Sequence, residues 1–511
     1  MLAKAFSQAV FGIDSFLVEV EVDVARGEQF FGIVGLPDTA VKESKDRVRS
    51  ALSNSGYHCP AVRIVVNLAP ADMRKEGPSL DLPIALALLG ALERVDPARL
   101  RDVCAIGELS LDGAVKPVTG VLPIALGAKA SNFRTLLVPS DNAAEAAVVD
   151  GVEVLPVASL REAVDYLNGV REIAPFRVNT SEIFHRNAHY DADFSDVKGQ
   201  EAAKRALEIA AAGGHNVLMI GPPGSGKTML AKRLPSILPD LTLEESIETT
   251  KIHSIAGLVS ARESLVATRP FRSPHHTISH IAMVGGGAIP RPGEVSLAHN
   301  GVLFLDEMPE FQRTVLEVLR QPLEDGVVNI SRASMSLSFP ARFILCGSMN
   351  PCPCGYSTDP KKVCRCSPQQ IQKYRSRLSG PLLDRIDLHI EVPAVSVAEL
   401  ATRHGSGEPS ERIRERVNRA RQRQRHRYSG LPRIHCNAHL GTRDLKRFCP
   451  LTADAHSMLV AALNSLGFSA RAYDRIIKVA RTIADLEDSD AIESHHVAEA
   501  INYRTLDRRL E

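Results

Sequence analysis

A glycine-rich loop between an apolar run and a helical pattern constrains this chain more than any other feature. Val217–Ile220 is expected to be a buried strand, and a helix is expected to follow the loop. The loop residues are Gly221, Pro222, Pro223, Gly224, Ser225, Gly226, Lys227 and Thr228. In a P-loop, backbone N–H groups surround phosphates, the lysine reaches the β- and γ-phosphates, and the hydroxyl ligates Mg²⁺. The sequence therefore predicts an α/β core that binds ATP and Mg²⁺; a chance glycine turn is the alternative.

A second apolar run ends in two acidic residues. Val302–Leu305 leads directly into Asp306 and Glu307. Strand ends are often acidic, so the pair gains its weight from its distance to the P-loop. Asp306 is predicted to hold Mg²⁺ together with Thr228, and Glu307 to polarise the water that attacks the γ-phosphate.

A third apolar run ends in a polar residue. Phe343–Met349 leads to Asn350, which occupies the place of the residue called sensor 1 in AAA+ ATPases. Sensor 1 orients the hydrolytic water, so Asn350 is a candidate catalytic residue. The alternative is a turn residue in front of Pro351.

The bulk properties are those expected of a cytoplasmic enzyme with several domains. A length of 511 residues allows about three domains. The net charge of +1 excludes a uniformly basic DNA-binding protein, so any nucleic-acid affinity must come from a local patch. We recognise no signal peptide and no apolar stretch of membrane-spanning length.

Changes in composition divide the chain into four parts. β-rich runs alternate with Ala/Leu-rich stretches in residues 1–168, and a polar linker follows at 169–194. The ATPase core is expected at 195–392. Residues 393–511 have apolar positions three and four apart, which is typical of helices.

Longer motifs surround the predicted site. They are Phe271–Thr277, Gly285–Gly287, Pro290–Asn300, Asn350–Gly355, Ser379–Asp387 and Ser469–Tyr473. Together with the P-loop they resemble the ComM/YifB family of magnesium-chelatase-like AAA+ ATPases over nearly the whole chain. The resemblance implies an α/β AAA+ core with a C-terminal α-helical lid. It also implies a homohexameric DNA helicase that drives branch migration in natural transformation, with DNA and recombination proteins as partners.

Two arginines gain roles from this resemblance. Arg385 matches the arginine finger, which reaches into the nucleotide site of a neighbouring subunit and therefore requires a ring. Arg471 matches sensor 2, which contacts phosphate from the lid. A surface salt bridge is the alternative for each, and Arg377 is a rival finger.

Four cysteines form a candidate metal site. Cys352 and Cys354 make one C-x-C pair, and Cys364 and Cys366 make another. Four thiolates can close a tetrahedral Zn²⁺ site. The spacing is tighter than the common C-x₂-C, so four reduced thiols are the alternative. The predicted cofactors are thus ATP, Mg²⁺ and a candidate structural Zn²⁺.

DNA contacts are expected at three places. The resemblance implies pore insertions, which would be the segment from His275 and His276 to Gly287, and a hairpin with Arg332 near its tip. The third is an arginine-rich helix with Arg412, Arg414, Arg416, Arg419, Arg421, Arg423, Arg425 and Arg427. These arginines either bind phosphates or pair with acidic neighbours.

The N-terminal part resembles a protease domain that has lost its base. Lys75–Leu80 and Gly107–Gly120 resemble the Lon protease domain, which implies a ribosomal protein S5 domain 2-like α+β fold. Ser79 occupies the place of the Lon nucleophile, but Leu122 occupies that of the catalytic lysine. A serine needs a base, so peptidase activity is not expected unless Lys75 or Lys116 substitutes.

Three classes of function therefore compete: a DNA motor, a chelatase-type remodelling ATPase acting on a protein partner, and an ATP-dependent protease. The missing lysine opposes the protease. The front domain favours the motor, because we expect magnesium-chelatase ATPase subunits to lack it.

Overall fold

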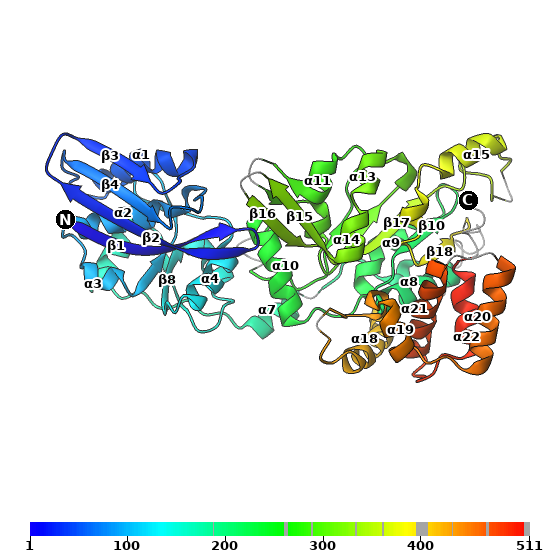
Figure 1. Ribbon diagram of the computed structural model, residues 1–511. Helices are drawn as coiled ribbons and strands as arrows, with labels where there is room; N and C mark the ends of the chain where they lie inside the picture. The colour runs from blue at the N-terminus through cyan, green and yellow to red at the C-terminus, as the bar shows by residue number, and fades with distance from the viewer. Residues whose placement is uncertain are drawn as a thin grey trace. The chain divides into compact units, whose positions relative to one another are not determined.

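The computed structural model divides the chain into two compact units (Figure 1). Residues 1–188 and 243–267 form the first unit, and residues 189–242 and 268–511 form the second. The structure describes residues 1–187, 189–259, 264–287, 290–332, 335–359, 362–394, 407–431, 433–466 and 470–504. Among these residues, no helix is both long and apolar enough to cross a membrane.

The first unit is built on a seven-stranded mixed sheet in the order β3-β4-β2-β1-β5-β8-β9. Its strands are β1 (Leu2–Phe11), β2 (Asp14–Ala25), β3 (Phe30–Val34), β4 (Arg63–Ala69), β5 (Val103–Ala105), β8 (Thr135–Pro139) and β9 (Glu153–Val157). β2 is antiparallel to β1 and β4, and the other neighbours are parallel. Alternate β2 residues Val18, Val20 and Val22 are buried, because successive side chains point to opposite faces.

Helices cover this sheet, and one of them is buried on all sides. The helices are α1 (Thr39–Asn54), α2 (Asp81–Ala91), α4 (Val121–Ala130) and α6 (Leu160–Leu167). Every residue of α2 is buried, as expected for a helix that is apolar all round. Its first residue, Asp81, is satisfied by Arg47, Ser44 and the backbone N–H of Leu109.

One helix belongs to the first unit although it follows the P-loop in the chain. α10 (Leu243–Ile255) packs against α4. Ser254 donates to the Glu145 carboxylate, and Lys251 pairs with Asp14. We expected residues 195–392 to form one continuous core. The structure instead groups 243–267 with the N-terminal residues, because the partners of this segment lie there.

The second unit contains five parallel strands in the order β11-β14-β17-β10-β18. They are β11 (Phe271–Arg272), β14 (Val302–Leu305), β17 (Ile344–Met349), β10 (Val217–Ile220) and β18 (Leu388–Glu391). β10, β14 and β17 are buried along their whole length, which explains their continuous apolar sequences. The P-loop, the acidic pair and Asn350 follow these strands, so they meet at one edge of the sheet.

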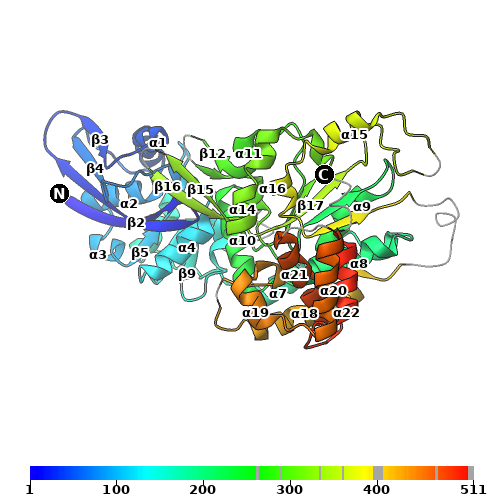
Figure 2. The same ribbon diagram turned by 45° about the vertical axis from the view of Figure 1, so that its right-hand side comes forward.

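Helices complete the second unit (Figure 2). α8 (Glu201–Gly213) and α9 (Lys227–Ile237) flank the P-loop strand in sequence. The C-terminal helices include α18 (Ser410–Arg427), α20 (Ala453–Leu466), α21 (Ala470–Leu486) and α22 (Ser494–Asn502), and α21 packs against α8 and α22. The predicted multidomain α/β architecture with a helical C-terminal region is confirmed.

A buried polar network joins the sheet to α21. His215 Nδ1 lies 2.9 Å from Asp387 Oδ2, and its Nε2 lies 2.8 Å from Thr482 Oγ1. Arg475 also pairs with Asp387. Burial would raise the pKa of Asp387, but the charge of Arg475 and the hydrogen bond with His215 lower it below its ordinary value. The carboxylate is thus held in its charged form.

Replacing Asp387 by asparagine should destabilise the second unit, because it leaves Arg475 without its charged partner. Breaking such a buried pair costs about 3–5 kcal/mol, which calorimetry would detect as a lower unfolding midpoint. Since the folded pKa is depressed, this stabilisation is present above about pH 4 and is lost as the pH falls below it. Asp490→Asn is the control, because that side chain is fully exposed. Equal midpoints for both variants at neutral pH would contradict the assignment.

Candidate active site

The P-loop requires glycine at several positions. A Cβ on Gly221 would lie 2.1 Å from the carbonyl oxygen of Val392, so no side chain fits there. Gly224 and Gly226 have φ values of +77° and +91°, which residues with a side chain rarely adopt. α9 begins directly after Gly226. The loop therefore ends at a helix N-terminus, where backbone N–H groups can bind phosphate.

Lys227 lies within this loop and beside the predicted sensor. Its Nζ donates to the carbonyl oxygens of Gly221, at 2.7 Å, and Pro222, at 2.9 Å. The same atom lies 3.4 Å from Asn350 Oδ1. Burial lowers the pKa of Lys227, and the charges of Asp306 and Glu307 act in the opposite direction. The structure thus brings four of the predicted catalytic residues together.

Asp306 connects the P-loop helix to the sensor strand. Thr228 Oγ1 donates to Asp306 Oδ2 at 2.8 Å, as expected if both residues serve one Mg²⁺. Ser348 donates to the other carboxylate oxygen and also lies 3.3 Å from the backbone nitrogen of Glu307. A hydroxyl and a carboxylate facing each other are hard oxygen donors and fit Mg²⁺. Sequence reasoning missed Ser348, although its place near the end of β17 could have indicated it.

Glu307 has a strained backbone. Its φ of +51° is uncommon for a residue with a side chain, and its backbone N–H donates to Asp306 Oδ1 at 3.1 Å. Residues with such uncommon backbone angles are held in place by the structure around them, and they are frequent at active sites. The side chain is exposed, so water can reach the carboxylate.

A second contact that sequence reasoning missed comes from Gln200, just before α8. It also has a positive φ, +60°. Its Nε2 donates to the carbonyl oxygen of Pro393 at 2.6 Å and lies 3.4 Å from that of Ser225 in the P-loop. The Gln200 side chain thus contacts both the P-loop and the residues that follow β18.

The two predicted arginines form ion pairs within the chain. Arg385 pairs with Glu324, and its side chain is only 9% exposed. Arg471 lies 3.0 Å from Asp384 and is 68% exposed. Arg377, the rival finger, pairs with Glu310 and is 51% exposed. An arginine finger must reach a neighbouring subunit, so Arg385 can serve only if its pair with Glu324 opens. The roles of Arg385 and Arg471 stay predictions.

The two candidate pore insertions pack together. His275 is exposed, and its ring centroid lies 4.1 Å from that of His276. β15 (Val327–Arg332) and β16 (Met335–Pro340) form the expected hairpin, with Arg332 at the end of β15. A Cβ on Gly285 would lie 3.1 Å from Ile330 of β15, so the two insertions are neighbours. Within the described residues, no carboxylate joins the histidines in a potential metal site.

The arginine-rich helix α18 is largely held by ion pairs. Four of its arginines pair with carboxylates: Arg414 with Asp240, Arg416 with Glu208 and Glu408, Arg423 with Asp488 and Asp490, and Arg427 with Asp485. Arg421 donates to the carbonyl oxygen of His435 at 3.1 Å. Arg412, Arg419 and Arg425 are exposed. Four of the eight arginines therefore pair with acidic neighbours, which was the alternative to phosphate binding. The three exposed arginines remain candidates for binding phosphate.

One candidate for the missing base, Lys75, and the residue at the place of the catalytic lysine, Leu122, are both buried. Lys75 is completely buried, and its ammonium donates to the carbonyl oxygen of Pro70. Burial lowers its pKa, and Asp72 opposes that shift. Leu122 is buried at the start of α4, where its backbone N–H donates to Glu145 at 2.9 Å. The place expected for a catalytic lysine is therefore occupied by an apolar side chain.

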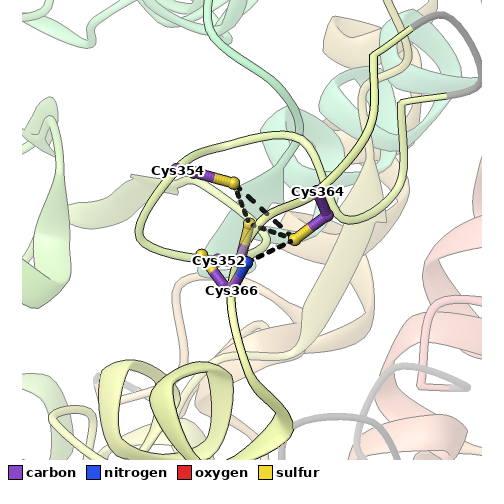
Figure 3. A group of neighbouring side chains, drawn as sticks. All are labelled: Cys352, Cys354, Cys364 and Cys366. Carbon is purple, nitrogen blue, oxygen red and sulfur yellow. Dashed lines mark hydrogen bonds between the residues drawn. The ribbon is translucent and has the colours of Figure 1, made fainter.

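The four cysteines of the candidate metal site converge after β17 (Figure 3). The sulfur of Cys352 lies 3.4 Å from that of Cys354 and 3.7 Å from that of Cys364. The Cys354 and Cys364 sulfurs are 3.6 Å apart. All four sulfurs, including that of Cys366, lie within 4.8 Å of one another.

Comparisons with known families cover most of the chain. Residues 193–400 match the family described as "Magnesium chelatase, subunit ChlI", and residues 407–504 match "Magnesium chelatase, subunit ChlI C-terminal". Residues 20–142 match "Subunit ChlI of Mg-chelatase". The last match removes our reason for expecting that the front domain separates a DNA motor from a chelatase-type ATPase.

Individual relatives match over the full length. The chain is 46% identical to "Competence protein ComM" of Haemophilus influenzae, over 100% of this chain and 99% of that protein. It is 45% identical to "Uncharacterized protein YifB" of Escherichia coli, over 100% and 98%. A shorter similarity, 27% identity over 34% of this chain and 35% of the other, connects it to "Lon protease 2" of Bacillus subtilis.

Proposed function

Since the chain belongs to the ComM/YifB family of magnesium-chelatase-like proteins, we propose that it is a hexameric ATP-dependent DNA helicase that promotes branch migration of recombination intermediates in natural transformation. The observation that carries this proposal is the full-length similarity to a competence protein, combined with a complete set of P-loop, acidic and sensor residues at one sheet edge. DNA and recombination proteins are the proposed partners, in the cytoplasm.

Each site residue has a step in the proposed reaction. The P-loop N–H groups and Lys227 bind the β- and γ-phosphates. Thr228 and Asp306 would hold Mg²⁺, which would supply positive charge to these phosphates. Glu307 polarises the attacking water, and Asn350 orients it. Arg385 of a neighbouring subunit stabilises the charge that develops on the γ-phosphate, and Arg471 contacts phosphate from the lid.

The front domain is proposed to be a Lon-like scaffold without peptidase activity. The motifs Lys75–Leu80 and Gly107–Gly120 support the Lon-like part of this proposal. The buried Lys75 and the buried Leu122 argue against catalysis. A ring of such domains would give the ATPase a platform around DNA.

The alternative is a chelatase-type ATPase that remodels a protein partner. The matches to magnesium chelatase families support it, because the same nucleotide site serves both functions. DNA-stimulated ATP hydrolysis separates the two proposals. Only a DNA motor should hydrolyse ATP faster with branched DNA at low salt, and only a motor should resolve that DNA.

We expect Arg332→Ala to weaken DNA-stimulated ATP hydrolysis and strand displacement while basal hydrolysis stays largely intact. Arg332 is at the end of β15, and none of the residues assigned to phosphate or Mg²⁺ belongs to the hairpin of β15 and β16. The measurement is the ATPase rate with and without branched DNA. A variant with the parental stimulation would contradict a DNA contact at this hairpin. ATPase activity indifferent to single-stranded, duplex and branched DNA would contradict the helicase proposal.

DNA binding by α18 can be tested by comparing its exposed arginines with an arginine that is held in an ion pair. Replacing the exposed Arg412, Arg419 and Arg425 by alanine should lower affinity for all DNA sequences alike, because phosphate contacts carry no base information. Each lost contact should also reduce the salt dependence of binding, by roughly 0.9 in the logarithmic slope. Arg423→Ala is the control: it breaks an ion pair with Asp490 and should leave that slope unchanged. An unchanged slope in the triple variant would contradict DNA binding by this helix.

A further inference from the structure

The cysteine cluster has the dimensions of a mononuclear metal site. Zinc bound by four thiolates has Zn–S bonds of about 2.3 Å, so a regular tetrahedron places the sulfurs about 3.8 Å apart. Three of the sulfur pairs here are separated by 3.4, 3.6 and 3.7 Å. A disulfide would bring two sulfurs to about 2.05 Å, and all four cysteines are free thiols. Figure 3 shows the side chains turned toward one another.

The cluster begins beside the nucleotide site. Cys352 is fully buried and is separated from Asn350 by one residue. Pro351, the residue between them, accepts a hydrogen bond from Arg375 at 3.2 Å through its carbonyl oxygen. Fixing the sulfur of Cys352 therefore restricts the backbone that carries the Asn350 amide.

The turn of the first cysteine pair also touches the P-loop. Gly355 has a φ of +86°, and its N–H donates to the carbonyl oxygen of Cys352 at 2.9 Å. A Cβ on Gly355 would lie 2.5 Å from Pro223 Cδ of the P-loop. The turn thus packs directly against the loop that binds phosphate, while Asn350 Oδ1 lies 3.4 Å from Lys227 Nζ.

We propose that the four cysteines hold one Zn²⁺ and that this ion positions Asn350 and the P-loop turn at Pro223 for ATP hydrolysis. The coordination is closed by four protein ligands, so the ion supplies no reacting group. Its effect on turnover is exerted through the positions of Asn350 and of the P-loop turn at Pro223. The inference rests on the proposed ATPase activity for its kinetic part, whereas the metal itself is measured independently.

The metal content is the first test. Wild-type protein purified without added zinc should carry about one Zn²⁺ per chain by elemental analysis. The double variant Cys354→Ser/Cys364→Ser should lose it, and Cys59→Ser, which changes a partly exposed cysteine outside the cluster, should keep it. Absence of metal from wild-type protein that hydrolyses ATP would overturn the inference. Wild-type protein that carries zinc but hydrolyses no ATP would overturn the proposed function instead.

The coupling to turnover is the second test, and it uses the wild-type chain so that misfolding of a variant cannot obscure it. Zinc is released with a thiol-modifying mercurial, the thiols are regenerated, and Zn²⁺ alone is added back in the presence of constant Mg²⁺. The zinc-free protein should bind a fluorescent ATP analogue within about threefold of the original Kd, while kcat falls at least tenfold and recovers with Zn²⁺. An unchanged kcat in zinc-free protein would overturn the positioning role. Parallel loss of binding and secondary structure would also overturn it, because the ion would then only hold the fold.

Discussion

Replacing Glu307 by glutamine is expected to leave ATP binding intact and to slow hydrolysis by about 10²–10⁴-fold, the usual contribution of a positioned acid–base group. The amide has nearly the same shape, but it cannot polarise the attacking water. Lys227→Ala should behave differently, because it removes a group that binds phosphate and so weakens binding or turnover. Single-turnover hydrolysis and binding of a fluorescent nucleotide, measured on the same preparations, separate the two effects.

A surface carboxylate serves as the control. Glu415 is exposed on α18, and Glu415→Gln should keep the parental rate. Hydrolysis by Glu307→Gln at the parental rate would show that another group polarises the water. The positive φ of Glu307 makes glutamine preferable to alanine, since the strained backbone is kept while only the charge is removed.

Replacing Arg385 by alanine should reduce turnover by about 10³–10⁵-fold, the range known for arginine fingers. The variant should still assemble and bind ATP. Arg377 is the other candidate for the finger, because its side chain is half exposed whereas Arg385 is buried against Glu324. Arg377→Ala is therefore the matched variant, and it should keep most of the activity. The reverse result would assign the finger to Arg377.

Mixing variants tests whether the finger acts between subunits. Subunits with Arg385→Ala have an intact phosphate site, and subunits with Lys227→Ala have an intact finger. Mixed rings should regain part of the activity, because some interfaces then combine both intact halves. The ATPase rate as a function of mixing ratio is the measurement. If co-assembly is demonstrated and no ratio restores activity, Arg385 does not act in trans.

The ATP site could be predicted because its determinants are local and its sheet is parallel. The P-loop, the acidic pair and Asn350 each follow an apolar run, and parallel strands end at one edge, so their proximity follows from the strand pattern. The Ser348 contact depends on which face of β17 meets Asp306, which the strand pattern alone did not show.

Long-range pairing limited the other predictions. The partners of the α18 arginines, such as Glu208 and Asp485, are distant in sequence. The spacing of the charges alone therefore could not decide whether these arginines bind phosphate or pair with acidic residues. The position of α10 was missed for the same reason. Its sequence is that of an ordinary helix after the P-loop, and only its contacts with Asp14 and Glu145 assign it to the first unit.

The path of the chain through α10 has a consequence for how this protein can be divided. A fragment starting at residue 195 would still contain 243–267, but Ile247 and Leu265 would have lost the apolar cluster in which they pack. The complementary fragment, 1–194, would expose the matching surface. Each fragment would therefore expose apolar surface that the intact chain buries. We expect deletion of the front domain to lower the solubility of the remaining chain, so a loss of activity in such a fragment would not reveal what the front domain does.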